Sequence, residues 1–252
     1  LGDMWRGGWF RDFDTRAQAW SAVRDPMQLA PLAAGLATPA QVAALAPAFD
    51  ALPPHCDVYP PLVWPPVAYT VFEAALAAGR DAGAAEQAVA LLDRVWRRMD
   101  ARDPEPDGAL PGVTREFWPE GDATTSAGIE GYGWGALTVH FLIRYVAGLR
   151  AESPDRFRLV PALPPAWRRP GTTFTVGPLA YGSGALTLTY AIPADASTRD
   201  QIDVTLQMSG VTGALVVSDD AGRELAHVAP APSGSVRISW PAQWLQPAVV
   251  VR

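Results

Sequence analysis

The pattern of hydrophobic and polar positions changes at about residue 150. Before that point alanine and leucine dominate, and apolar residues recur with helical periodicity. Beyond Phe157 apolar and polar residues alternate in short runs, which is typical of strands. We therefore predict an α+β protein with two domains: a helical domain over 1–150 and a β domain over 151–252, connected through residues 151–157.

Proline and glycine indicate where the first helices begin and end. Thr38 is placed to cap a helix that begins at Pro39, and Pro47 disturbs the end of that helix. A second helix follows Pro66 and stops at Gly79. This second helix is apolar on nearly every side, so we expect neighbouring elements to cover it all round.

The next two helical segments differ in how their apolar residues are distributed. Residues 84–102 are amphipathic, whereas 134–149 is apolar on nearly every side and is expected to hold His140 as a hydrogen-bonded core histidine. The expected apolar stripe of the amphipathic segment consists of Ala88, Leu91, Leu92, Val95, Trp96 and Met99. The residues expected to face away from it are Asp93, Arg94, Arg97 and Arg98.

The alternation of all-apolar and amphipathic helices indicates inner and outer positions in a double ring of helices, an α/α toroid. A simple helical bundle has the same periodicity and stays open as an alternative. A complete double ring needs several hundred residues, and only about two or three helix pairs fit before residue 150. We therefore expect a partial toroid.

Short strand-like runs fill the second part of the chain. Turn-forming residues separate these runs, and their regular spacing predicts an antiparallel β-sandwich. The runs are FRLVP, TTFTVG, ALTLTYAIP, QIDVTLQM, ALVVSD, ELAHVA, SVRISW and AVVV.

Composition limits the chemistry. All 20 basic residues are arginine, which excludes Schiff-base and pyridoxal-phosphate enzymes and the phosphate-binding loop that ends in lysine. With one cysteine and three scattered histidines we expect no metal site and no cofactor, although calcium held by carboxylates stays open. A net charge of −6 without a basic cluster argues against nucleic-acid binding. No apolar stretch reaches the ~20 residues of a membrane helix, so we expect no membrane partner.

The candidate chemistry lies in residues 103–130, a long, acidic and glycine-rich segment. Loops of this length in a compact domain are usually functional or disordered, and the aromatic pair Phe117–Trp118 favours order. Aromatic faces stack on sugar rings and carboxylates act as acid, base or hydroxyl acceptor, a combination that suits carbohydrate chemistry. Each acid alone is more simply a solvated surface residue. The candidate acids are Glu116, Glu120, Asp122 and Glu130, with Asp12 and Asp14 further away.

Several stretches, taken in order, resemble a known group of enzymes. They are WFRDFD (9–14), YPPLVWPPVAYTVFEAAL (59–76), REFWPEG with GYGWGAL (115–121, 131–137) and FRLVPALPPAW (157–167). In this order they resemble the C-terminal portion of the six-hairpin glycosidases, which are (α/α)6-barrel enzymes. That group includes glycoside hydrolase family 63, the mannosylglycerate-hydrolase-like enzymes, trehalases and α-L-rhamnosidases. The last stretch resembles the link into the β-domain of rhamnosidase-like members.

The resemblance implies an inverting glycoside hydrolase in which Glu116 is the general base that activates water. In those enzymes the general acid lies earlier in the barrel. We therefore expect the chain to be inactive or nearly so by itself and to need the missing N-terminal part of the same barrel as its partner, with a carbohydrate as substrate. The expected substrate-binding residues are Trp64, Trp118, Tyr132, Trp134, Asp12 and Asp14. For the two aspartates, a role in a cap or turn is an equal alternative.

Other functions remain open from sequence. The link at 157–167 favours an α-L-rhamnosidase-type hydrolase. A polysaccharide lyase on an α/α toroid would use tyrosine and histidine near arginine in place of paired acids. A non-catalytic sugar-binding or scaffold protein would have the same modules without turnover. The cellular compartment and the identity of the sugar also stay open.

Overall fold

The chain combines helices with antiparallel sheets, as the α+β prediction states. It divides into two compact units, Leu1–Leu142 and Ile143–Arg252. Among the residues described below, no helix is long and apolar enough to cross a membrane. The computed structural model describes residues 2–58, 62–99, 115–117, 127–130, 133–153, 156–194, 201–210, 215–218, 224–228, 233–241 and 249–251.

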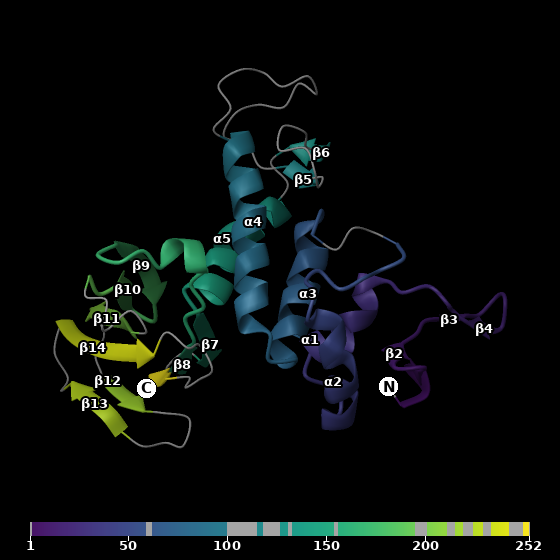
Figure 1. Cartoon of the computed structure of the whole chain (residues 1–252), viewed down its shortest axis with the longest axis horizontal. Helices are drawn as coiled ribbons and strands as arrows, with labels where there is room; N and C mark the ends of the chain where they lie inside the picture. The colour runs from purple at the N-terminus through teal and green to yellow at the C-terminus, as the bar shows by residue number, and fades with distance from the viewer. Residues whose placement is uncertain are drawn as a thin grey trace. The chain divides into compact units, whose positions relative to one another are not determined.

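The first unit begins with two small antiparallel ribbons (Figure 1). Each ribbon has an edge-to-face aromatic contact between cross-strand partners, Trp5 with Phe10 in one and Phe13 with Trp20 in the other. The guanidinium of Arg6 lies 4.9 Å from the ring centroid of Trp20 and links the two ribbons. The elements are η1 (Gly2–Met4), β1 (Trp5–Arg6), β2 (Trp9–Phe10), β3 (Phe13–Asp14) and β4 (Ala19–Trp20).

Short helices follow, and the predicted cap at Thr38 is confirmed. The Thr38 side chain accepts a hydrogen bond from the backbone N–H of Gln41, whose side chain accepts one from the N–H of Thr38. The helix ends at Leu45 and continues as a tighter turn that contains Pro47, as the sequence predicts. The elements are η2 (Pro26–Leu29), α1 (Ala30–Ala33), α2 (Pro39–Leu45) and η3 (Ala46–Phe49).

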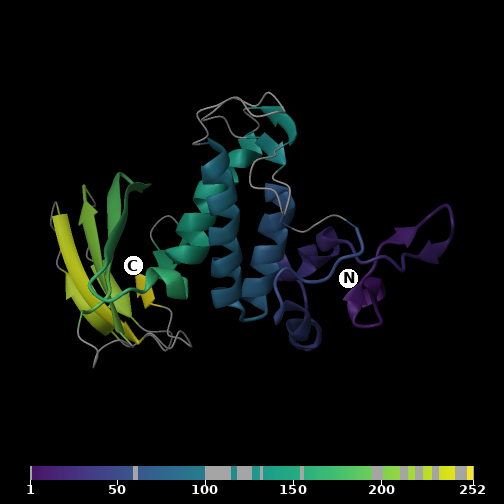
Figure 2. The same ribbon diagram turned by 45° about the horizontal axis from the view of Figure 1, so that its top comes forward.

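Two longer helices, α3 (Pro65–Ala77) and α4 (Asp81–Met99), lie side by side and antiparallel (Figures 1 and 2). Proline occupies the first position of α3, and Gly79, with φ of 71°, follows its end in the left-handed conformation. Most of α3 is buried, as predicted, and Phe72 meets Phe141 edge to face at 5.2 Å between ring centroids. On α4 the buried residues of the predicted stripe are Ala88, Leu91 and Val95.

Among the α4 positions whose side chains are described, Trp96 and Arg94 differ from the prediction. Trp96 is 69% exposed, although the periodicity placed it in the apolar stripe. Arg94, expected to face away, is only partly exposed, and its Nη2 donates a hydrogen bond of 3.4 Å to the carbonyl oxygen of Leu62. Its long apolar stem lets the guanidinium reach the segment that precedes α3.

The predicted helix over 134–149 is wrong in its extent. The segment forms a 3-10 turn η4 (Gly133–Ala136), a short helix α5 (Leu137–Phe141), a π-helical turn η5 (Leu142–Val146) and then a strand, β7 (Leu149–Ser153). Gly148 has φ of 79°, which ends helical geometry before that strand. His140 is exposed rather than in the core, and its ring lies 5.9 Å from that of Tyr69.

The second unit contains two antiparallel sheets with strand orders β14-β11-β10-β9 and β13-β12-β15-β8-β7 (Figure 1). Each predicted strand-like run overlaps a strand of the structure. The sequence missed β7, because residues 151–157 read as a connection. The other strands are β8 (Arg156–Leu159), β9 (Thr173–Tyr181), β10 (Gly184–Ala191), β11 (Gln201–Ser209), β12 (Leu215–Ser218), β13 (Glu224–Val228), β14 (Ser233–Pro241) and β15 (Val249–Val251), with a turn η6 (Pro165–Trp167).

Strands β10 and β11 carry the core of this unit. Their apolar side chains alternate with polar ones along each strand, and the apolar set is buried. Tyr190 is fully buried, its hydroxyl donates to the carbonyl oxygen of Ala147, and burial raises its pKa well above the ordinary value. The buried set comprises Leu186, Leu188, Tyr190, Ile202, Val204 and Leu206.

Candidate functional site

Glu116 lies on a short strand next to the helices of the first unit. Strand β5 (Arg115–Phe117) pairs antiparallel with β6 (Ala127–Glu130). Arg115 is the register partner of Glu130. β5 also contacts η4, the turn that contains Trp134, and η4 in turn contacts α3. The segment that precedes α5 therefore connects the strand of Glu116 to the helix that follows Trp64.

Trp64 stands directly before α3 in an extended conformation, with φ of −113° and ψ of 116°. The next residue, Pro65, imposes this conformation because its ring excludes helical geometry from the residue before it. The Trp64 side chain is half-buried. The hydrogen bond from Arg94 to Leu62 holds the same segment from the side of α4. Trp64 is thus fixed at the end of the helix pair where α3 begins and α4 ends.

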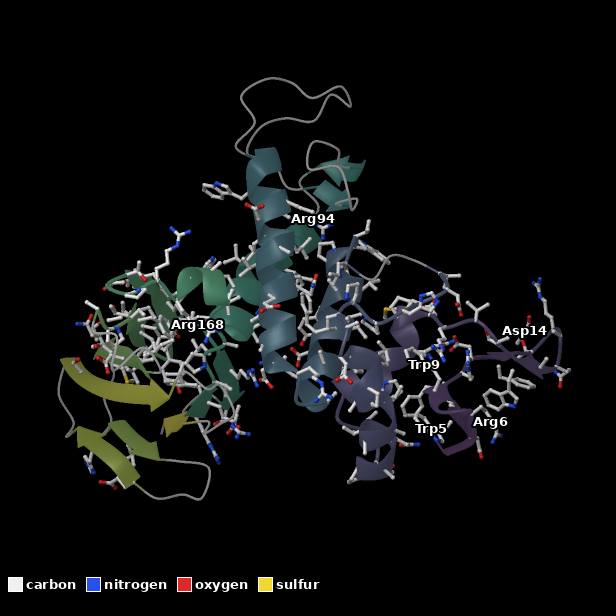
Figure 3. All side chains as sticks on the ribbon, in the orientation of Figure 1. Trp5, Arg6, Trp9, Asp14, Arg94 and Arg168 are labelled. Carbon is white, nitrogen blue, oxygen red and sulfur yellow. The ribbon has the colours of Figure 1, made fainter. Side chains whose placement is uncertain are left out.

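In both ribbon views, β5 and β6 lie beyond the start of α3 and close to the end of α4 (Figures 1 and 2). Figure 3 shows Arg94 at this end of α4. The structure therefore groups the backbone of Glu116 and Trp134 with Trp64. Trp118 and Tyr132 lie outside the described residues, as do the side chains of Glu116 and Trp134.

Asp14 is the last residue of β3 and holds the turn that follows the strand. Its Oδ1 accepts hydrogen bonds from the N–H groups of Arg16 and Ala17, at 2.8 and 3.0 Å. These bonds, that of Ala17 foremost, lower the pKa of the Asp14 carboxyl below its ordinary value. Figure 3 places Asp14 on the β3–β4 hairpin, away from α3 and α4, so the structure does not group it with Trp64.

Asp12 is exposed, but a buried side chain donates a hydrogen bond to its carboxylate. Its Oδ2 accepts a 2.7 Å hydrogen bond from Nε2 of Gln28, a residue that is 5% exposed. Oε1 of Gln28 accepts from the indole N–H of Trp9 at 2.9 Å and from the backbone N–H of Asp25 at 3.2 Å. The oxygen of the Gln28 amide thus accepts from Trp9 and Asp25, and its nitrogen donates to the Asp12 carboxylate. Such a buried partner orients a carboxylate at the surface.

Sequence reasoning missed Gln28, although a signal for it exists. Asp25 followed three residues later by glutamine is the pattern of a capping box, and the structure shows both bonds of that box at the start of η2. Nothing in the local pattern indicates that the same amide also reaches Trp9 and Asp12, which lie 19 and 16 residues earlier. Arg94 was also missed, because helical periodicity placed it on the outer face.

A second polar group surrounds Cys56. Its neighbour His55 makes a 3.4 Å contact with Asp57 rather than with the thiol. Asp57 also accepts a 2.7 Å hydrogen bond from the backbone N–H of Arg24, the main cause of a lowered pKa at this carboxyl. Burial, with smaller contributions from Asp25 and Asp57, raises the pKa of the Cys56 thiol to about 11. The thiol is therefore poorly suited to act as a nucleophile.

The side chains around Cys56 line a hollow of about 430 Å³. Its lining combines alanines and prolines with Arg24, whose guanidinium lies 5.2 Å from the ring centroid of Trp9. Within the described part of the chain, no group of three or more His, Cys, Asp or Glu side chains is arranged to hold a metal ion.

Comparison with known proteins adds no family assignment. No protein-family model matches the chain, and no curated protein sequence matches it.

Proposed function

We propose that this chain is the C-terminal part of an inverting glycoside hydrolase in which Glu116 is the general base. One arrangement supports the proposal. The strand that carries Glu116, the turn that carries Trp134 and the start of α3 next to Trp64 come together at one end of the helices, although they are far apart in the sequence. These are three of the elements on which the resemblance to six-hairpin glycosidases rests.

The chemistry requires two carboxyl groups on opposite faces of the scissile bond. In the proposed reaction Glu116 takes a proton from a water molecule, and the resulting hydroxide attacks the anomeric carbon. A carboxylic acid supplied by the missing N-terminal part of the barrel protonates the departing oxygen. Inverting enzymes hold the two carboxyls roughly 6.5–9.5 Å apart, which leaves room for the water.

Aromatic side chains and a fixed carboxylate complete the proposed site. Trp64, Trp118, Tyr132 and Trp134 would stack against the apolar faces of the sugar. Asp12, oriented by Gln28, would accept a hydrogen bond from a sugar hydroxyl. Asp14 would shape the β3–β4 turn that follows Asp12.

The proposed function also implies a finer architecture. The helices of the first unit would be part of an α/α toroid, with α3 and α5 as inner helices and α4 as an outer one. The two antiparallel sheets of the second unit would pack face to face as a β-sandwich. The edge-to-face contact between Phe157 on β8 and Tyr181 on β9, 5.3 Å between ring centroids, supports this packing because it joins strands of the two sheets.

Replacing Glu116 in the full-length gene product tests the proposal. In assays on aryl glucosides, mannosides and rhamnosides, Glu116→Gln should lower kcat by about 10²–10⁴-fold with KM nearly unchanged, the loss expected for a general base. Proton NMR of the first product formed should show inversion at the anomeric carbon.

Glu130→Gln is the matched control, because Glu130 lies on the paired strand β6 opposite Arg115. This variant should retain kcat within a few-fold. Equal losses in both variants would mean that the hairpin matters only structurally, and unchanged turnover in Glu116→Gln would remove Glu116 from the mechanism. Sugar binding without turnover in the full-length wild type would favour a non-catalytic sugar-binding protein.

A further inference from the structure

The four-stranded sheet of the second unit has two chemically different faces. The side chains of Leu188, Tyr190 and Leu206 point to the buried face. The intervening positions are polar and reach solvent, and most carry a hydroxyl or an amide. The two faces follow from the strict alternation of side chains along β10 and β11.

A hollow of about 470 Å³ lies on the polar face, over β10, β11 and β14. Its centre is a row of directly paired positions: Thr187 on β10 is the partner of Gln207 on β11, which is the partner of Ser235 on β14. Gly234 and Ser235 contribute little side-chain volume, and small side chains leave the space open. The lining residues are Thr187, Gln207, Met208, Ser209, Gly234 and Ser235.

On the β9 side of the hollow, a glycine lies next to Thr187. The pairing between β9 and β10 is interrupted between Leu186 and Leu188. At this bulge Gly177, with φ of 142°, lies against Thr187, and a side chain at Gly177 would overlap the Thr187 backbone and hydroxyl. Glycine at this position therefore leaves Thr187 uncovered.

The polar groups that line the hollow are neutral and available. Thr187, Gln207, Ser209 and Ser235 make no side-chain hydrogen bond to any residue that the structure describes. By contrast, Thr175 and Thr189, which lie on the same face outside the hollow, bond to each other at 3.2 Å. Hydroxyl and amide groups both donate and accept hydrogen bonds, as the hydroxyls of a sugar do.

Charge and size restrict the ligand further. The described lining residues are all uncharged, which suits a neutral ligand. Adjacent strands are roughly 4.8 Å apart, comparable to the width of a pyranose ring, so one sugar could span two of the paired residues. The volume is in the range of small-molecule sites.

We propose that this hollow is a binding site for a neutral saccharide, separate from the site at Glu116 and without catalytic residues. Binding uses neutral hydrogen bonds from the Thr187 hydroxyl and the Gln207 amide and leaves the ligand chemically unchanged. The proposal does not depend on the hydrolase function, because the two sites lie in different units of the chain.

Affinity gel electrophoresis of the whole chain tests the proposal, with soluble starch, xylan and galactomannan as neutral probes and alginate as the anionic one. At least one neutral polymer should retard the wild type, and alginate should not. Gln207→Ala should weaken the retarding affinity about threefold to tenfold, the loss expected for one neutral hydrogen bond. The double variant Thr187→Val/Gln207→Ala should abolish retardation, and Thr175→Val should leave it unchanged.

Two further measurements distinguish binding at this hollow from binding at the Trp64 site and from an effect of the substitutions on folding. Hydrogen exchange of the wild type with an oligosaccharide of the retarding polymer should slow in β10, β11 and β14, a readout that needs no variant. Trp64→Ala should leave retardation intact, since Trp64 belongs to the other site. Retardation lost in Trp64→Ala but kept in the double variant, retardation by alginate alone, or no retardation by any neutral polymer would overturn the proposal.

Discussion

The indole N–H of Trp9 donates a 2.9 Å hydrogen bond to the side-chain oxygen of Gln28, and the two residues are 2% and 5% exposed. Trp9 lies on β2 and Gln28 in η2, so the bond attaches the N-terminal ribbon to the first helical turn. Because both groups are shielded from water, the indole N–H of Trp9 depends on Gln28 for its acceptor.

We therefore expect Gln28→Leu to destabilise the first unit by about 2–3 kcal/mol. The substitution leaves the Trp9 N–H buried without an acceptor and removes one half of the capping box at Asp25. Hydrogen exchange across a urea series, followed for peptides of residues 2–58, measures the change. Gln41→Ala, in the more exposed capping box of α2, is the control and should cost about 1 kcal/mol or less. Equal effects would contradict the role of the buried bond.

The sequence predicted correctly those elements that depend on interactions between residues close together in the chain. The cap at Thr38 and the alternation around Leu188 depend on bonds or faces within a few residues, so the sequence contains them. The need for glycine at position 148 could not be predicted in this way, because it arises from the close approach of Val160, 12 residues further along the chain. The helix over 134–149 failed for that reason.

For the candidate site, the sequence indicated which stretches belong together but not what their side chains contact. The motifs at Trp64, Glu116 and Trp134 were identified from their order along the chain, and in the structure the turn that carries Trp134 contacts both β5 and α3. Gln28 was not found, because a bond across 16 or 19 residues leaves no periodic signal.

Cys56 should react slowly with iodoacetamide in the folded chain. Burial, then Asp25 and Asp57, raise its pKa to about 11, so at pH 8 the reactive thiolate is scarce. The rate should be on the order of a hundredfold below that of an ordinary thiol and should still rise tenfold per pH unit at pH 9–10. Mass spectrometry of the alkylated chain measures it. In urea the same chain should show the plateau of a free cysteine, and a plateau near pH 9 in the folded chain would contradict the shift.

Gly148→Ala should destabilise the second unit by about 3 kcal/mol or more. Gly148 has φ of 79°, and an added Cβ would overlap the carbonyl group of Val160. Gly182 is a matched control: its φ is 56°, but no atom lies within 4 Å of an added Cβ. Gly182→Ala should therefore cost only about 1–2 kcal/mol. Urea titration followed by hydrogen exchange in β10 and β11 measures both changes, and similar losses would show that backbone strain alone matters.

Trp96 provides a direct test of where the interior of the first unit ends. The periodicity of α4 placed it with Leu91 and Val95, but it is 69% exposed while Leu91 is fully buried. Trp96→Gln should therefore change the free energy of unfolding by less than about 0.5 kcal/mol, whereas Leu91→Ala should cost about 2–5 kcal/mol. Hydrogen exchange of α4 peptides across a urea series measures both. A cost of 2 kcal/mol or more for Trp96→Gln would mean that another surface covers the indole in solution, and a dependence of that cost on protein concentration would identify this surface as a second copy of the chain.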